Sequence, residues 1–158
     1  MRNILLAGLL FITITGFSQN IPSVKIEELT RIIDTSQQPL AINFWATWCA
    51  PCIEEIPWLE KQAKLYKDKG VKLILVSLDF AEDFPGKIAD FVKKNKYQSQ
   101  VLWLAETNAD IFCPQIDKSW EGNIPATLFV DNSKNYRHFI GRQVSESQLK
   151  TEFEKLVK

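Results

Sequence analysis

The fold of this chain is decided by one stretch, Phe44-Trp45-Ala46-Thr47-Trp48-Cys49-Ala50-Pro51-Cys52. It joins an apolar segment at residues 40–46, which is typical of a buried β-strand, to a segment with helical periodicity that begins near residue 50. The two cysteines are one helical turn apart and can close a disulfide. The first lies at the helix N-terminus, where unpaired backbone N–H groups stabilise a thiolate. This setting indicates redox chemistry.

The segments on either side of this stretch predict an α/β fold, with a central mixed β-sheet flanked by helices. Apolar periodicity predicts helices at residues 25–34, 50–69, 84–96 and 146–157. Strands are predicted at residues 40–46, 71–78, 101–104, 126–130 and 136–140, the last two forming a hairpin around a turn at 131–135. The poorly defined segment 107–120 is interpreted as a bridge with a short helix at 109–116. The order predicts a parallel core with an antiparallel edge.

The first 18 residues have the pattern of a signal peptide. Arg2 supplies a positive charge, residues 4–14 are apolar, and Gly16 and Ser18 are small residues before a cleavage site at Gln19. The apolar run is far shorter than the ~20 residues that span a bilayer. We therefore expect an exported, periplasmic protein with one domain at residues 19–158, and an uncleaved membrane anchor is the alternative.

The charge balance argues against a nucleic-acid partner. Removal of Arg2 with the signal peptide leaves 18 of the 19 basic side chains against 19 acidic ones. In an exported chain, three cysteines predict one pair and one leftover thiol. Cys113 is that leftover thiol, and burial as a free thiol is its leading interpretation. The alternative roles of Cys113 are a second redox step and an intermolecular disulfide.

The quoted stretch, followed by Glu55-Ile56-Pro57 and later by Ile124-Pro125-Ala126-Thr127, resembles the thioredoxin superfamily. Within it, the chain is similar to the TlpA-like branch of extracytoplasmic thiol–disulfide oxidoreductases. The resemblance implies a thioredoxin-like fold, Cys49 as the exposed nucleophile and Cys52 as the cysteine that resolves a mixed disulfide. It also assigns Glu55 the role of exchanging a proton with Cys52.

Helical phase places Glu55 at the edge of the stripe that contains Cys52. A carboxyl group beside apolar residues should have a raised pKa, which suits proton exchange with a thiol. A solvated glutamate without a role is the alternative. Asn43, on the preceding strand, cannot accept a proton as the buried Asp of thioredoxins does, and this supports a role for Glu55. Its alternative role is to satisfy neighbouring backbone groups.

Two further features predict a substrate-binding surface. The resemblance implies that the Ile124–Pro125 bond is cis and faces the cysteine pair, where its backbone can bind an extended client segment. An ordinary trans proline that begins a strand is the alternative. Trp48 is expected to cover the apolar side of the pair and to contact substrate.

These observations predict an enzyme that exchanges electrons with protein disulfides through Cys49 and Cys52. The TlpA-like resemblance implies that it reduces them, for example in cytochrome c maturation. Its expected partners are protein clients and a membrane-bound thiol reductant, and we expect a monomer without cofactor or metal. A disulfide oxidase or isomerase is the alternative within redox chemistry. A binding module without turnover, stabilised by a disulfide or by zinc, is the alternative from another class. Zinc would need Cys49, Cys52, Cys113 and His138.

Overall fold

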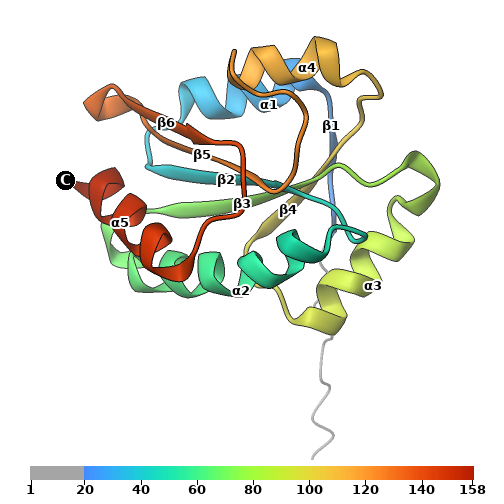
Figure 1. Ribbon diagram of the computed structural model, residues 1–158, viewed down its shortest axis with the longest axis horizontal. Helices are drawn as coiled ribbons and strands as arrows, with labels where there is room; N and C mark the ends of the chain where they lie inside the picture. Colours follow the sequence, from blue (N-terminus) through green and yellow to red (C-terminus); the bar gives the residue numbers. More distant parts are fainter. Residues whose placement is uncertain (1–19) are drawn as a thin grey trace, which may run out of the picture.

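The computed structural model describes residues 20–158, in which five α-helices flank a six-stranded sheet (Figure 1). The predicted signal peptide at residues 1–18 lies outside the described residues. The strands are β1 (Ser23–Val24), β2 (Leu40–Trp45), β3 (Lys72–Ser77), β4 (Gln100–Leu104), β5 (Ala126–Asp131) and β6 (Tyr136–Ile140). The helices are α1 (Ile26–Thr35), α2 (Ala50–Leu65), α3 (Gly86–Asn95), α4 (Ala109–Ile116) and α5 (Glu146–Val157). Between residues 20 and 158, no helix is both long and apolar enough to cross a bilayer.

The sheet has the order β1-β4-β3-β2-β5-β6. Strands β1 to β4 are mutually parallel where they pair, β5 runs antiparallel to β2, and β6 runs antiparallel to β5. The predicted mixed sheet with a parallel core and an antiparallel edge is confirmed. Strand β1 was not predicted, because two residues are too few to show an alternating pattern.

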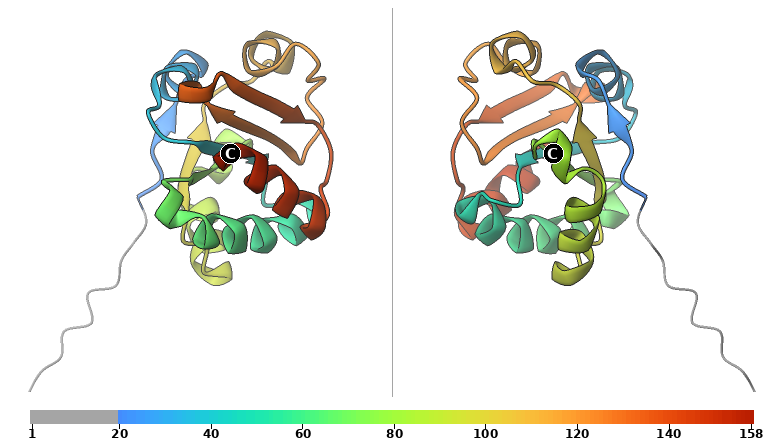
Figure 2. Two further views of the ribbon diagram at one scale, coloured as in Figure 1. Left: turned by 90° about the vertical axis from the view of Figure 1, so that its left-hand side faces the viewer. Right: turned by 90° about the vertical axis from the view of Figure 1, so that its right-hand side faces the viewer.

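Side chains of the sheet alternate between two apolar layers. On β2, Ala41 and Trp45 join the layer beneath α2, α3 and α5, whereas Ile42 and Phe44 join the layer beneath α1 and α4. Figure 2 shows the helices on the two sides of the sheet. Strand β2 is buried on both faces, and its residues are therefore all apolar except Asn43.

Helices α2 and α3 differ slightly from their predicted bounds, and α4 matches its predicted bounds. Helix α2 ends at Leu65, and a short 3-10 turn (Lys67–Lys69) leads to Gly70, whose φ of +80° suits glycine. Helix α3 begins at Gly86 rather than at residue 84, since Phe84 is extended before Pro85. Helix α4 lies at the predicted residues 109–116, capped by the side chain of Asn108.

Candidate active site

The two cysteines lie where β2 ends and α2 begins. Cys49 and Cys52 form a disulfide with a Cα–Cα distance of 5.3 Å. Cys49 is the N-cap of α2, and its Sγ accepts a hydrogen bond from the backbone N–H of Cys52 at 3.3 Å. A thiolate at this position would receive the same N–H group together with the positive end of the helix dipole. Cys49 is 5% exposed and Cys52 is fully buried, so only Cys49 reaches solvent.

Glu55 is fully buried, one helical turn after Cys52. Its Oε1 accepts hydrogen bonds from Asn43 Nδ2 at 3.0 Å and Thr127 Oγ1 at 3.4 Å, and its Oε2 accepts the backbone N–H of Val144 at 2.5 Å. Burial raises the pKa of Glu55 to about 7, although these three donors favour the carboxylate and lower the pKa in part. The side chain is therefore a buried acid–base group that titrates near neutral pH, not a solvated glutamate.

Two of the three donors to Glu55 come from the paired strands β2 and β5, and Val144 lies just before α5. Asn43 on β2 lies opposite Thr127 on β5, and Asn43 Nδ2 donates to Thr127 Oγ1 at 2.9 Å. The same amide also approaches the carbonyl oxygen of Ala126 at 3.4 Å. Asn43 therefore both holds Glu55 and satisfies a backbone group. Neither Thr127 nor Val144 was predicted as a partner of Glu55, although pairing the 40–46 strand with the 126–130 strand would have identified Thr127.

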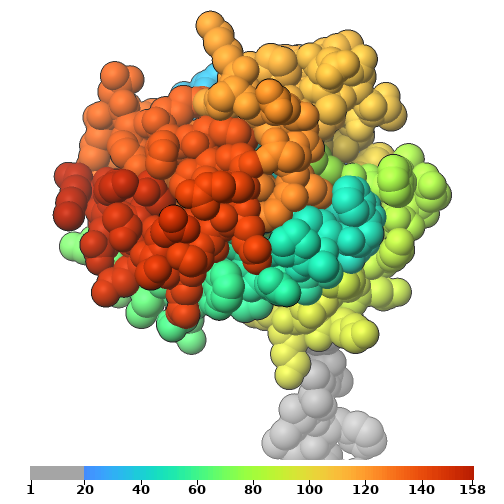
Figure 3. Space-filling model, in the orientation of Figure 1, coloured from blue at the N-terminus to red at the C-terminus, as the bar shows by residue number. Residues whose placement is uncertain are grey.

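Ile124 and Pro125 lie at the end of the sheet that carries the cysteines. The register pairs Ala126 with Phe44, so Pro125 comes level with Trp45, four residues before Cys49. The Ile124–Pro125 bond is cis, as expected. Ile124 is partly buried and packs against the apolar layer that contains Cys49 and Cys52. Figure 3 shows the start of α2 (teal) beside the segment that precedes β5 (orange) on one face.

Trp48 has a different environment from the one expected. Its ring stacks on Phe80, with ring centroids 6.1 Å apart, and it is 54% exposed. The indole is therefore a surface group rather than a cover over the cysteine pair. Its contact with a substrate stays a prediction.

The third cysteine lies in the other layer of the core. Cys113 is free, is 1% exposed and packs with residues of α1 and α4 on the opposite face of the sheet from the disulfide. Burial, and secondarily the charge of Asp110, raises the pKa of the Cys113 thiol to about 11. His138 pairs with Glu152 at 2.7 Å. The four ligands of the zinc alternative are thus not brought together, and residues 20–158 hold no cluster of three or more His, Cys, Asp or Glu side chains that could bind a metal.

We expect Cys113→Ala to retain near-normal disulfide exchange, because a thiol on the far face of the sheet cannot reach the disulfide. The smaller side chain should lower the free energy of unfolding by about 1 kcal/mol or less, through the vacated volume. Thiol titration of the oxidised native protein should detect one slowly reacting thiol in the wild type and none in the variant. A loss of turnover as large as that in Cys49→Ser would instead indicate a three-cysteine relay.

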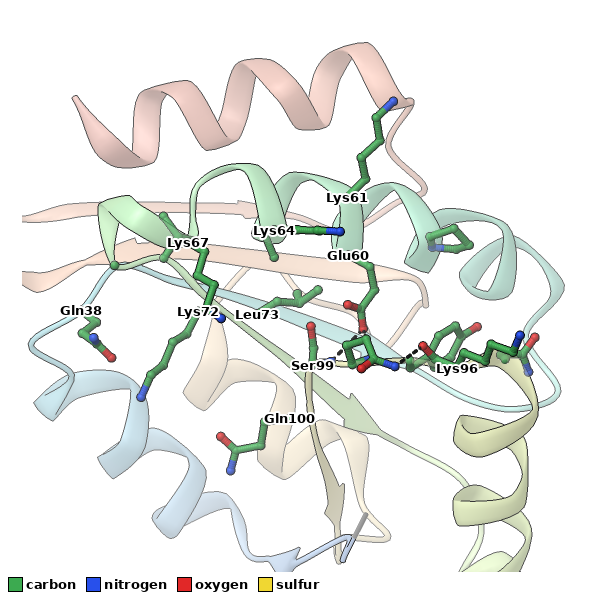
Figure 4. Close-up of a pocket in the computed structure, with 17 residues that line it drawn as sticks. Gln38, Glu60, Lys61, Lys64, Lys67, Lys72, Leu73, Lys96, Ser99 and Gln100 are labelled. Atoms are coloured by element: carbon green, nitrogen blue, oxygen red, sulfur yellow. Dashed lines mark hydrogen bonds between the residues drawn. The ribbon is translucent and has the colours of Figure 1, made fainter. Parts of the chain in front are cut away.

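A separate groove lies at the other end of the sheet, where β3 and β4 begin (Figure 4). Five lysines line it, namely Lys61, Lys64, Lys67, Lys72 and Lys96, although the ammonium group of Lys61 points away from the groove and pairs with Glu146. In its wall, Glu60 Oε1 accepts the backbone N–H groups of Gln98 and Ser99, each at 2.9 Å. Because the cysteines follow the carboxyl end of β2, this groove is not part of the candidate active site.

A family model described as the AhpC/TSA family matches residues 17–139. The chain belongs to the AhpC/TSA family. Among its relatives, the thiol-disulfide oxidoreductase ResA of Oceanobacillus iheyensis is 36% identical over 69 residues, and the match covers 39% of this chain and 36% of ResA. ResA of Bacillus cereus is 28% identical over 121 residues, covering 72% of this chain and 61% of ResA. This AhpC/TSA-family chain therefore spans less than two thirds of either ResA protein.

This AhpC/TSA-family chain is also similar to a solved structure. The thioredoxin-related protein from Neisseria meningitidis serogroup B is 25% identical, with a TM-score of 0.64, and the match covers 77% of this chain and 86% of the other. The resemblance to the thioredoxin superfamily is confirmed, and the similarity to ResA confirms the TlpA-like resemblance. The Cys49–Cys52 disulfide lies within the matched residues 17–139.

Proposed function

We propose that this protein is an exported thiol–disulfide oxidoreductase that reduces protein disulfides through Cys49 and Cys52. The observation that carries the proposal is the disulfide at the start of α2, with the buried Glu55 one turn away on the same helix. The relatives named as thiol-disulfide oxidoreductases support it.

The reaction starts from the reduced pair. The Cys49 thiolate attacks one sulfur of a client disulfide, forms a mixed disulfide and expels the other client sulfur as a thiolate. The Cys52 thiolate then attacks Cys49 Sγ, closes the intramolecular disulfide and expels the remaining client sulfur. Two electrons pass to the client, and the protein ends in the disulfide form described above. A dithiol reductant, which we propose to be membrane-bound, returns the pair to the reduced state.

Glu55 supplies the base for the second step in this proposal. A buried Cys52 thiol must lose its proton before it can attack, and bulk water has little access to it because Cys52 is fully buried. A carboxyl group with a pKa of about 7 can accept that proton near neutral pH and return it when the disulfide is reduced. Asn43, Thr127 and Val144 hold the carboxylate in place.

Clients are proposed to bind across Trp48 and the Ile124–Pro125 segment. Both flank the cysteine loop, Trp48 by sequence and Pro125 through the pairing of β5 with β2. The TlpA-like resemblance supports the reductive direction, a periplasmic location and a role such as cytochrome c maturation. We propose that the protein acts as a monomer.

The reduction potential of the Cys49–Cys52 couple tests the direction of electron flow. We expect a value near the roughly −270 mV of thioredoxin, because a reductase must be more reducing than its clients. Equilibration with a defined dithiol buffer, followed by the fraction of alkylated cysteines, measures it. A value near the roughly −120 mV of a strong oxidant would support the oxidase alternative. A protein that binds clients without consuming reductant would be a binding module.

A further inference from the structure

Four large apolar side chains are prominently exposed in residues 20–158, namely Trp48, Leu65, Phe80 and Ile111. Scattered exposed apolar residues are normal, whereas a contiguous patch indicates a binding surface. Trp48 and Phe80 form such a patch, since their rings stack with centroids 6.1 Å apart and an interplanar angle of 21°. Trp48 is the residue directly before Cys49, so this patch adjoins the solvent-reaching sulfur.

The loop that carries Phe80 is tied to the loop that carries Trp48. The two carboxylate oxygens of Asp79 accept the backbone N–H of Thr47 at 3.0 and 3.1 Å, and Asp79 Oδ1 accepts the Thr47 hydroxyl at 2.6 Å. Asp79 is itself 4% exposed. Thr47 precedes Trp48, and Asp79 precedes Phe80, so one buried carboxylate joins the two backbone segments that carry the rings.

A second set of contacts, made by Trp103, holds the loop that carries Phe80. The indole N–H of Trp103 donates to the backbone carbonyl oxygen of Asp79 at 2.9 Å, and the Trp103 ring stacks on Phe84 with centroids 4.3 Å apart. A surface that is already held in place loses little conformational entropy on binding. The two exposed rings are thus a preorganised apolar surface.

We propose that Phe80 and Trp48 together form an aromatic shelf that binds a large apolar or aromatic side chain next to the reactive cysteine of a client. The inference rests on the proposed function and names the client class of that site. Phe, Tyr and Trp side chains contribute much of the binding energy of protein interfaces because each buries a large apolar area. Phe80 is therefore a client-selecting residue, and it makes no contribution to the sulfur chemistry itself.

The test uses the reduced protein and two synthetic peptides that differ in one residue beside a single cysteine, phenylalanine in one and serine in the other. Each cysteine carries thionitrobenzoate as a mixed disulfide. The Cys49 thiolate attacks the peptide sulfur, forms a Cys49–peptide disulfide and expels the coloured thionitrobenzoate thiolate, whose absorbance gives the rate. Hydroxyethyl disulfide, which has no aromatic ring, reports the sulfur chemistry alone through the loss of alkylatable protein cysteines.

Wild-type protein should react at least about fivefold faster with the phenylalanine peptide than with the serine peptide, as expected for one aromatic contact. Phe80→Ser should reduce this preference to less than twofold, and Phe80→Tyr should retain it. Leu65→Ser is the matched control, because Leu65 is 66% exposed at the far end of α2. It should retain the preference, and both serine variants should react normally with hydroxyethyl disulfide.

Two results would overturn the shelf while leaving the proposed function intact. One is equal reactivity of the two peptides with wild-type protein that reacts normally with hydroxyethyl disulfide. The other is a preference in Phe80→Ser as large as that in Leu65→Ser. Failure of reduced wild-type protein to react with hydroxyethyl disulfide would contradict the proposed function, and the shelf with it.

Discussion

Cys49→Ser is expected to reduce exchange with protein disulfides to the rate of the uncatalysed reaction. The serine hydroxyl does not ionise near neutral pH, so no anion is available at the helix N-terminus to attack a disulfide. Cys52 cannot take over, because it is fully buried and only Cys49 reaches solvent. Turnover of a protein disulfide with dithiothreitol as reductant measures the effect. Cys113→Ala is the matched control for the loss of a cysteine.

Cys52→Ser is expected to retain the first chemical step and to lose the second. Its Cys49 thiolate still attacks, but nothing attacks Cys49 Sγ in turn, so the client stays bound as a mixed disulfide. Non-reducing electrophoresis should show this adduct, and reduction with dithiothreitol should cleave it. An adduct with Cys49→Ser, and none with Cys52→Ser, would reverse the roles of nucleophile and resolving cysteine.

The sequence predicts those helices and strands whose apolar residues recur at a regular spacing or form a long apolar run. Strands β2 and β3 are long apolar runs, and α5 carries regular apolar spacing, so both their type and their order were predicted. Strand β1 has only two residues, and its pairing with β4 is a tertiary contact that no local pattern contains. The start of α3 was misplaced because Pro85 was counted inside the helix, although Phe84 is extended.

The candidate site was predicted less completely than the fold. Helical phase placed Glu55 at the edge of the buried stripe, and the structure buries it fully. Phase describes one helix in isolation, whereas Glu55 is covered by residues from elsewhere in the chain: Asn43 on β2, Thr127 on β5 and Val144 before α5. The same reason applies to Phe80. Exposure of a loop residue such as Phe80 is ordinary, and Phe80 indicates a binding surface only because its ring contacts Trp48.

Glu55→Gln is expected to slow disulfide exchange about tenfold or more near neutral pH, since general acid–base catalysis typically contributes at least that much. The amide can accept the Val144 N–H but cannot take a proton from Cys52. In the wild type, the rate of the second step should rise with pH through the Glu55 pKa of about 7. In the variant, this rise should move to higher pH, where Cys52 ionises without a base. Stopped-flow measurement across pH 5 to 9 gives both profiles.

Glu54→Gln is the matched control, because Glu54 is the exposed neighbour of Glu55 on the same helix. It removes the same charge and should leave the pH profile unchanged. Superimposable profiles for wild type and Glu55→Gln would remove Glu55 from the mechanism, even though its burial would remain.

The stability of the oxidised protein gives an independent test of the same buried acid. The pKa of Glu55 is higher in the folded state, about 7, than its ordinary value of 4.5, because burial disfavours the charged form. The protonated carboxyl group is therefore favoured by folding. Its contribution to the free energy of unfolding is fully present below pH 4.5 and is lost as the pH rises through 7. A difference of this size corresponds to a loss on the order of 3 kcal/mol in the free energy of unfolding.

Denaturant unfolding of the oxidised protein between pH 4.5 and 8 measures this loss. Glu55→Gln has no proton to release at this position, so its free energy of unfolding should change less over the same range, whereas Glu54→Gln should follow the wild type. Equal pH dependence in wild type and Glu55→Gln would mean that the carboxyl group keeps an ordinary pKa in the fold. In that case Asn43, Thr127 and Val144 would stabilise the carboxylate strongly enough to offset its burial, and the group would be too weak a base for Cys52.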